Sequence, residues 1–266
     1  MAKLTLSEIW IYPIKSLGGI RLKSSKVLPK GLLYDRRWML IDDEGCFITQ
    51  RVHPAMAFFK LSLSGDHITI AYKDEYKYLS AQAAVSSIPV TATIWDDTVE
   101  VFEVLGDYSQ WFSQRLGINC RLVYFPEVNQ RPIDEKYRLK NDQVSLADGY
   151  PFLIIGQSSL DDLNSRLVNP LPMNRFRPNF VFTGGVPFEE DDWRSFTIGN
   201  SRFAGVKPCS RCVLTTVNQE TAERGSEPIS TLATYRKSNN KIYFGQNLLV
   251  LECNEIYEGD SIELGH

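Results

Sequence analysis

Strand-sized runs of alternating apolar and polar residues fill the first hundred positions of the chain. These runs occur at residues 4–11, 20–28, 67–71, 76–79, 90–95 and 98–104. A further hairpin is predicted from residues 37–41 and 46–49, because the acidic run between them ends in Gly45 and favours a tight turn. Short strands separated by turns about every 8–12 residues predict a barrel or a sandwich rather than a doubly wound sheet.

The first clear helical pattern covers residues 108–116. Asp107 is expected to cap its first turn through the side chain, and Gly117 to end it in the left-handed conformation. A polar, charged stretch with two prolines follows at 126–142. We expect the domain boundary within it, which gives an N-terminal β domain at 1–125 and a second domain at 126–266.

The second half of the chain mixes both patterns. A helix is predicted at 159–167, with Ser158 or Ser159 as its N-cap, and a short one at 228–236 with a proline at an early position. Strands are predicted at 152–155, 179–182, 196–198, 202–206, 213–217 and 248–251. The predicted fold class is therefore mostly β with a few helices.

Composition excludes several classes of protein. The 266 residues are 43% hydrophobic, which is typical of a globular chain, and the net charge of −3 gives no basic surplus for general nucleic-acid binding. No apolar run approaches the ~18 residues of a membrane-spanning helix. The N-terminus lacks the apolar core of a secretory signal, and the five cysteines are an odd number, so reduced thiols and a cytoplasmic location are expected.

The string Cys209-Ser210-Arg211-Cys212 is the most informative local motif. A C-x-x-C pair is compatible with half a zinc site, a redox pair or two packing cysteines. A second C-x-x-C is absent and the three histidines are scattered, which argues against structural zinc. The β-branched run after the motif lacks the strand-to-helix context of a thioredoxin-like pair.

Cationic residues recur at the ends of predicted strands. Each one alone is typical of a solvated surface charge, but together they could converge on an anion, for which Arg offers a planar fork of donors and Lys a point charge. The residues concerned are Lys15, Arg36, Arg51, Arg177 and Arg211.

Longer strings carry a resemblance to a known family. They are Tyr-Pro-Ile-Lys-Ser-x-x-Gly at 12–19, Asp-Arg-Arg-Trp at 35–38, Asp-Gly-Tyr-Pro-Phe-Leu-Ile at 148–154, Arg-Phe-Arg-Pro-Asn at 175–179, Lys-Pro-Cys-Ser-Arg-Cys-x-x-Thr-Thr-Val at 207–217 and Phe-Gly-Gln-Asn at 244–247. Because these strings follow one another in the order typical of the family, the chain resembles MOSC-domain proteins with an N-terminal β-barrel extension. Among them, it is similar to bacterial relatives of the mitochondrial amidoxime-reducing component. The resemblance implies a β-barrel MOSC domain plus a smaller N-terminal β-barrel-like domain.

The resemblance also implies a molybdenum cofactor, in which a molybdopterin dithiolene and one protein thiolate hold the metal. Cys212 is the implied metal ligand and catalytic residue, while Cys209 lies beside it or is structural. Asn179 either contacts the cofactor or orients neighbouring loops. The implied cofactor-binding residues are Lys15, Ser16, Arg36, Arg177, Ser210, Arg211 and Cys212, with Gly149 and Tyr150 in an adjoining turn and Arg51 as an addition.

The implied reaction is a two-electron reduction of N-oxygenated small molecules, namely hydroxylamines, amidoximes and N-oxides. No histidine falls inside a matched string, so no general acid is identified. The chain has no C-x4-C-x2-C string of a plant-type ferredoxin, so electrons are expected from a separate flavoprotein or iron–sulfur protein. Neither nucleic acid nor a membrane is an expected partner.

Two other functions remain open at this level. One is a carrier of the molybdenum cofactor or of sulfur that does not reduce N–O bonds. The other is a β-rich thiol protein that uses the C-x-x-C pair. The reductase and the carrier both predict molybdenum and a pterin, whereas only the reductase predicts turnover of N–O compounds.

Overall fold

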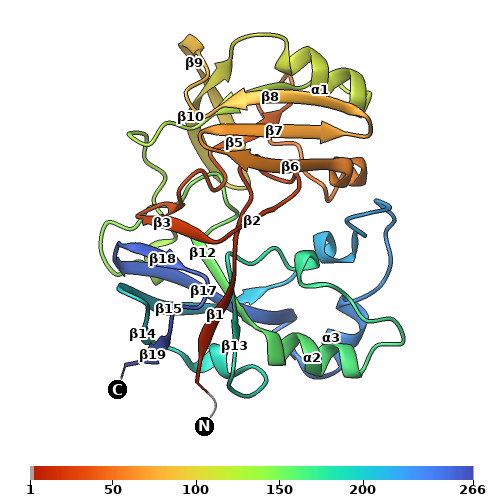
Figure 1. The fold of residues 1–266 in the computed structure, drawn as a ribbon. Helices are drawn as coiled ribbons and strands as arrows, with labels where there is room; N and C mark the ends of the chain where they lie inside the picture. Colours follow the sequence, from red (N-terminus) through yellow and green to blue (C-terminus); the bar gives the residue numbers. More distant parts are fainter. Residues whose placement is uncertain (1–2, 266) are drawn as a thin grey trace.

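A computed structural model describes residues 3–265 of the chain. Strands account for 43% of residues and helices for 17%, which confirms the predicted mostly β class. Figure 1 shows an upper half, in orange and yellow, above a lower half of green and blue elements that also contains the red strand β1. The residues 1, 2 and 266 at the ends of the two predicted domains lie outside the described residues.

The lower half is built on a nine-stranded sheet. Its order is β19-β14-β15-β17-β12-β13-β1-β2, with β16 attached to β17. The strands are β1 (Thr5–Ile11), β2 (Ile20–Leu22), β12 (Phe152–Gly156), β13 (Phe180–Thr183), β14 (Ser195–Ile198), β15 (Ser201–Ser210), β16 (Lys237–Ser238), β17 (Lys241–Glu252) and β19 (Ile262–Leu264).

The upper half contains two smaller sheets. The four-stranded one has the order β5-β11-β10-β9, and the other is the antiparallel meander β6-β7-β8. Their strands are β5 (Trp38–Ile41), β6 (Phe59–Ser64), β7 (His67–Tyr72), β8 (Glu75–Ser80), β9 (Val85–Ile94), β10 (Asp97–Val104) and β11 (Arg121–Tyr124). A third small sheet joins β3 (Ser24–Leu28), β4 (Gly31–Leu32) and β18 (Glu255–Tyr257).

Helices are few and short. The α-helices are α1 (Tyr108–Leu116), α2 (Gln157–Ser165) and α3 (Ile229–Tyr235). The 3₁₀ turns are η1 (Pro54–Phe58), η2 (Glu135–Tyr137), η3 (Met173–Arg175), η4 (Glu189–Asp192) and η5 (Val213–Thr216).

Strands from the start of the chain pair with strands from its second half. β1 pairs with β13, and β3 pairs with β18 near the other end of the sequence. One hydrophobic cluster also runs through both halves, since it contains Phe59 of the upper half and Phe180 of the lower. The boundary at 125/126 stays a prediction, but the first strands pack with the second half.

Two predicted strands are wrong. Residues 46–49 form only isolated bridges, in which Phe47 pairs with Ile41 and Cys46 with Thr93. Residues 213–216 form the 3₁₀ turn η5, because the Thr215 and Thr216 hydroxyls donate to the carbonyls of Cys212 and Val213 at 3.0 and 2.7 Å. These local hydroxyl bonds outweigh the strand preference of a β-branched run.

Helix α1 has the predicted bounds, and Gly117 adopts the left-handed conformation at φ 68°. The predicted side-chain cap is wrong, since Asp107 pairs with Lys77 instead. Helix α2 begins two residues before the predicted start, without a serine cap. The Ser159 hydroxyl instead donates to the buried Glu190 carboxylate at 2.9 Å.

Glu190 provides a test of the packing between α2 and η4. Its side chain is fully buried, accepts a hydrogen bond from the Gly156 amide at 3.0 Å, and burial raises its pKa from 4.5 to about 6. The folded state therefore binds this proton more tightly than the unfolded state does. Between pH 4.5 and pH 6 the contribution of Glu190 to the free energy of unfolding should fall by about 2 kcal/mol as the pH rises.

The Glu190→Gln variant removes this titration. Urea denaturation of wild type and variant at several pH values should show the variant gaining about 2 kcal/mol relative to wild type as the pH rises through this window. Glu263→Gln, at an exposed position, is the control. Parallel pH profiles for wild type and Glu190→Gln would contradict the raised pKa.

Candidate functional site

A pocket opens where the two halves meet, and residues distant in sequence line it. Segments 147–153, 176–179 and 209–215 contribute from the lower half. All predicted site residues line this one pocket: Lys15, Ser16, Arg36, Arg51, Gly149, Tyr150, Arg177, Ser210, Arg211 and Cys212. The structure thus brings the predicted set together, while the roles of these residues stay predictions.

Three of these residues have an unusual backbone conformation. Ser16, Arg36 and Arg177 have φ angles of 69°, 49° and 55°, in the left-handed region that non-glycine residues rarely adopt. The Arg36 amide donates to the Tyr12 carbonyl at 3.0 Å, which helps to hold that turn. Such strain concentrates at ligand-binding sites, where the surrounding structure must enforce it.

Cys212 presents an exposed thiol at the junction of β15 and η5. Arg51, from the upper half, donates its Nε–H to the Cys212 sulfur at 3.1 Å. This contact places a cationic side chain from the upper half directly against the sulfur.

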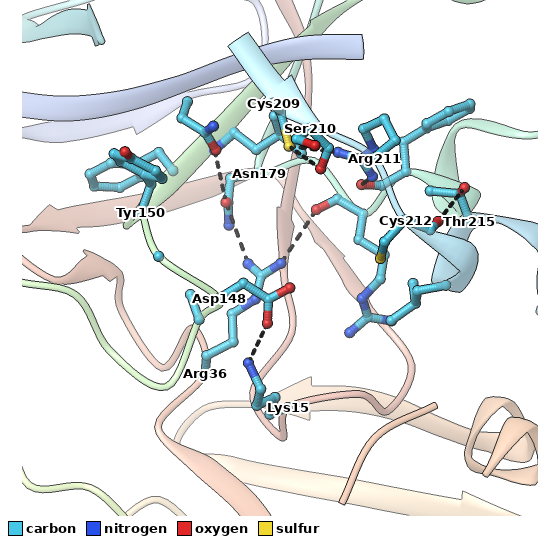
Figure 2. A pocket seen from close by; sticks show the side chains of 18 of the residues that line it. Lys15, Arg36, Asp148, Tyr150, Asn179, Cys209, Ser210, Arg211, Cys212 and Thr215 are labelled. Atoms are coloured by element: carbon cyan, nitrogen blue, oxygen red, sulfur yellow. Dashed lines mark hydrogen bonds and ion pairs between the residues drawn. The ribbon is translucent and has the colours of Figure 1, made fainter. Parts of the chain in front are cut away.

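Cys209 has different surroundings. Its sulfur accepts a hydrogen bond from Arg211 Nη1 at 3.0 Å, and its side chain packs against the hydrophobic cluster that contains Phe176 and Phe244. Both cysteines are free thiols, and Figure 2 shows them close to Ser210 and Arg211, where β15 ends. Packing and hydrogen bonding therefore account for Cys209, whereas Cys212 is the thiol that Arg51 of the upper half contacts.

Asp148 is a site residue that sequence reasoning did not include. Its carboxylate accepts from Lys15 Nζ at 2.7 Å (Figure 2). It also accepts from Arg51 Nη2 at 2.5 Å, so it joins cations from two segments. Burial alone would raise the pKa of Asp148, but Lys15 and Arg51 outweigh it and hold the pKa well below its ordinary value. Asp148 is therefore an anchor for two cations and not a proton donor at neutral pH.

Lys15 makes the charge of the pocket dependent on pH. Its side chain is buried, and burial lowers the pKa of the ammonium group to about 8 despite the opposing effect of Asp148. Lys15 is therefore cationic at pH 7 and mostly neutral at pH 9. An anion in the pocket is held less strongly at the higher pH.

Inorganic sulfate tests this property, because sulfate does not titrate in this range. For cofactor-free protein, we expect the sulfate dissociation constant to rise about fivefold between pH 7 and pH 9, corresponding to about 1 kcal/mol for one partly screened charge. Isothermal calorimetry of wild type and Lys15→Met measures it. In the Lys15→Met variant, the sulfate dissociation constant should change less between pH 7 and pH 9 than it does in wild type. An equal change in both proteins would contradict the lowered pKa of Lys15.

Arg36 and Arg177 form the inner wall of the pocket around Tyr12. Their guanidinium carbons lie 4.3 and 4.2 Å from the Tyr12 ring centroid. Arg36 also pairs with Asp35 at 2.6 Å. Among residues 3–265 the Arg177 side chain has neither a hydrogen bond nor an ion pair with a protein group.

Arg177 is 8% exposed, and burial lowers its pKa to about 10. A buried cation without an anionic partner is costly, so this position favours a bound anion. The pocket lining as a whole contains five cationic side chains against one carboxylate, Asp148. This charge balance and the exposed thiol fit a ligand that combines a phosphate with a metal.

Asn179 has a structural role. Its amide nitrogen donates to the Trp10 carbonyl and to Asp35, both at 3.1 Å. Its side-chain oxygen accepts from the Leu153 amide at 3.3 Å and from Arg36 at 3.4 Å (Figure 2). Both ends of the amide are thus occupied, and Asn179 orients the neighbouring loops.

Sequence comparison identifies the class of protein that this fold and site define. Residues 3–119 match the MOSC N-terminal beta barrel domain and residues 141–263 match the MOSC domain, so the chain belongs to the MOSC family. It is 34% identical over 284 residues to mitochondrial amidoxime-reducing component 1 of Mus musculus, covering 98% of this chain and 82% of the relative.

Two further relatives extend this result. Mitochondrial amidoxime-reducing component 1 of Homo sapiens is also 34% identical, with the same coverage. The molybdenum cofactor sulfurase of Oryza sativa subsp. japonica is 29% identical, over 98% of this chain and 34% of the sulfurase. Within residues 3–265, no helix has the length and apolarity to cross a membrane. The similarity supports a function related to the molybdenum cofactor.

Proposed function

We propose that the protein binds a molybdenum cofactor in this pocket and catalyses two-electron reduction of N-oxygenated compounds. The observation that carries the proposal is the exposed Cys212 thiol beside a cationic pocket that includes the unpaired Arg177. Similarity to amidoxime-reducing components along nearly the whole chain supports the same reaction class. Hydroxylamines, amidoximes and N-oxides are the proposed substrates.

The chain offers donors for each part of such a cofactor. Cys212 would supply the protein thiolate to molybdenum, and Arg51 would stabilise that thiolate through its 3.1 Å hydrogen bond. When bound, the cofactor supplies two-electron oxygen removal from N–O groups, which no side chain here can perform. The proposed phosphate-binding residues are Lys15, Ser16, Arg36 and Arg177, with Gly149, Tyr150, Ser210 and Arg211 around the pterin and the metal ligand.

The residues around the metal ligand also organise the pocket. Asp148 holds Arg51 at 2.5 Å, so that Arg51 can reach Cys212 from the opposite half of the molecule. We further propose that electrons come from a separate flavoprotein or iron–sulfur protein, since the sequence has no ferredoxin cysteine string. The cytoplasmic location suggested by the free cysteines stays a prediction.

A carrier of the molybdenum cofactor is the second candidate, favoured by the similarity to the rice sulfurase. The test uses protein produced in a host that synthesises the cofactor. Molybdenum analysis and pterin fluorescence after acid oxidation should give near-stoichiometric values, and reduced methyl viologen should drive reduction of benzamidoxime. Cofactor without turnover would favour the carrier, and the absence of both from folded protein would overturn the proposal.

A further inference from the structure

Trp95 lies at the tight turn between β9 and β10 and is 49% exposed. Its φ angle is 56°, a conformation that favours glycine or asparagine at such turns and is unusual for a bulky residue. Packing against Phe47 holds the indole, with ring centroids 5.1 Å apart and an edge-on arrangement. A strained, half-exposed tryptophan is therefore kept in one position.

This position adjoins the candidate site. The Arg51 guanidinium lies 4.6 Å from the Trp95 ring centroid, and the indole Nε1 lies 3.4 Å from the Asp148 carboxylate. Arg51 also donates to the Cys212 sulfur at 3.1 Å. Two contacts thus connect the indole to the proposed metal ligand, and Trp95 adjoins two lining residues of the pocket, Arg51 and Asp148, without lining it itself.

Exposed apolar side chains occur next to the same residues. Val52 follows Arg51 in the chain and is 68% exposed, and Val213 follows Cys212 and is 55% exposed. The pocket lining contains five cationic side chains, whereas these two exposed apolar residues directly follow lining residues in the chain. A ligand suited to both regions has a polar end near Cys212 and an apolar body near Trp95.

We propose that Trp95 is a specificity-determining residue that packs against the planar aromatic body of the substrate. The inference rests on the proposed function and adds a substrate class to it: aromatic amidoximes and hydroxylamines are preferred over small aliphatic ones. Aromatic groups contact tryptophan rings favourably in offset or edge-on arrangements. Because this contact lies away from the N–O group, it strengthens substrate binding and leaves the reaction step itself unchanged.

The test compares benzamidoxime with acetamidoxime, which share the reacting group and differ in the body. The cofactor-loaded wild type, Trp95→Ala and Trp95→Phe are assayed with reduced methyl viologen. We expect Trp95→Ala to raise KM for benzamidoxime about tenfold with kcat nearly unchanged, and to change KM for acetamidoxime less than about twofold. Trp95→Phe should retain most of the preference.

A binding measurement gives a readout besides activity. Calorimetric titration of the oxidised, cofactor-loaded protein with benzamidoxime should show about tenfold weaker binding for Trp95→Ala. Ile88→Ala is the matched control, because Ile88 is 72% exposed on the same hairpin. The circular dichroism spectrum and molybdenum content of each variant must match those of wild type. If Trp95→Ala is unstable, the comparison is made with Trp95→Phe.

The possible results separate this inference from the proposed function. Equal effects on both amidoximes, or no effect on either, would overturn the role of Trp95. A defect that appears only with a protein electron donor would assign Trp95 to partner docking and would also overturn it. If wild type reduces neither compound, the proposed function fails, while the calorimetric comparison still decides whether Trp95 binds the aromatic group.

Discussion

Cys212→Ser is expected to abolish both molybdenum content and N–O reduction, whereas Cys209→Ser should keep the metal. Cys212 is exposed and is contacted by Arg51 across the junction of the two halves. A serine hydroxyl at that position stays protonated at neutral pH and does not supply the thiolate that the proposed metal site requires. Cys209 is bound to Arg211 and packs against the core cluster, so its replacement removes packing and no metal ligand.

Metal analysis per polypeptide, pterin fluorescence and amidoxime reduction together measure this difference. Cys253→Ser is the matched control, because Cys253 is another exposed cysteine and lies outside the pocket lining. Near-ultraviolet circular dichroism checks that each variant is folded. Equal loss of molybdenum in folded Cys209→Ser and Cys212→Ser proteins would show that one thiolate is not the sole protein ligand.

The fold class was predictable because β-strands leave a two-residue alternation in the sequence. The hairpins β7–β8 and β9–β10 appear where alternation flanks a polar turn. The predicted side-chain caps are wrong because tertiary contacts decide which partner a capping side chain binds. Asp107 has the right spacing for a cap but forms an ion pair with Lys77. The Ser159 hydroxyl donates to the Glu190 carboxylate instead of capping a helix.

The candidate site was predictable mainly from family strings, since charge spacing alone does not bring residues together. Lys15, Arg51 and Cys212 are far apart in the chain, and the contacts of Arg51 with Asp148 and Cys212 bring them to one pocket. Asp148 and Trp95 were missed because their importance lies in contacts with Arg51. Asp148 stands at the start of the matched string at 148–154, so its position in the motif was a usable signal.

The pocket is therefore shared between the two halves of the molecule. The lower half supplies the thiol and Arg177, and the upper half supplies Arg51, which packs on Trp95. A change in the packing between the halves would separate Arg51 from Cys212. This arrangement makes the charge of the pocket a property of the assembled chain.

Arg177→Ala should weaken cofactor retention by about 1.5–3 kcal/mol, or about 10- to 150-fold in the dissociation constant, through loss of a charge-assisted contact with phosphate. The cofactor-free variant should keep or gain stability, because it no longer buries a guanidinium without an anionic partner. Loss of molybdenum during timed dialysis and thermal unfolding of the cofactor-free protein measure the two effects.

Arg202→Ala, at a surface ion pair with Glu252, controls for the loss of one positive charge. Arg177→Lys should retain part of the affinity, since lysine keeps the charge but lacks the planar fork. Unchanged retention in Arg177→Ala would remove Arg177 from the proposed phosphate site. A cofactor-free variant that unfolds at a much lower temperature would instead show that Arg177 stabilises the fold itself, because an unpaired buried cation predicts the opposite sign.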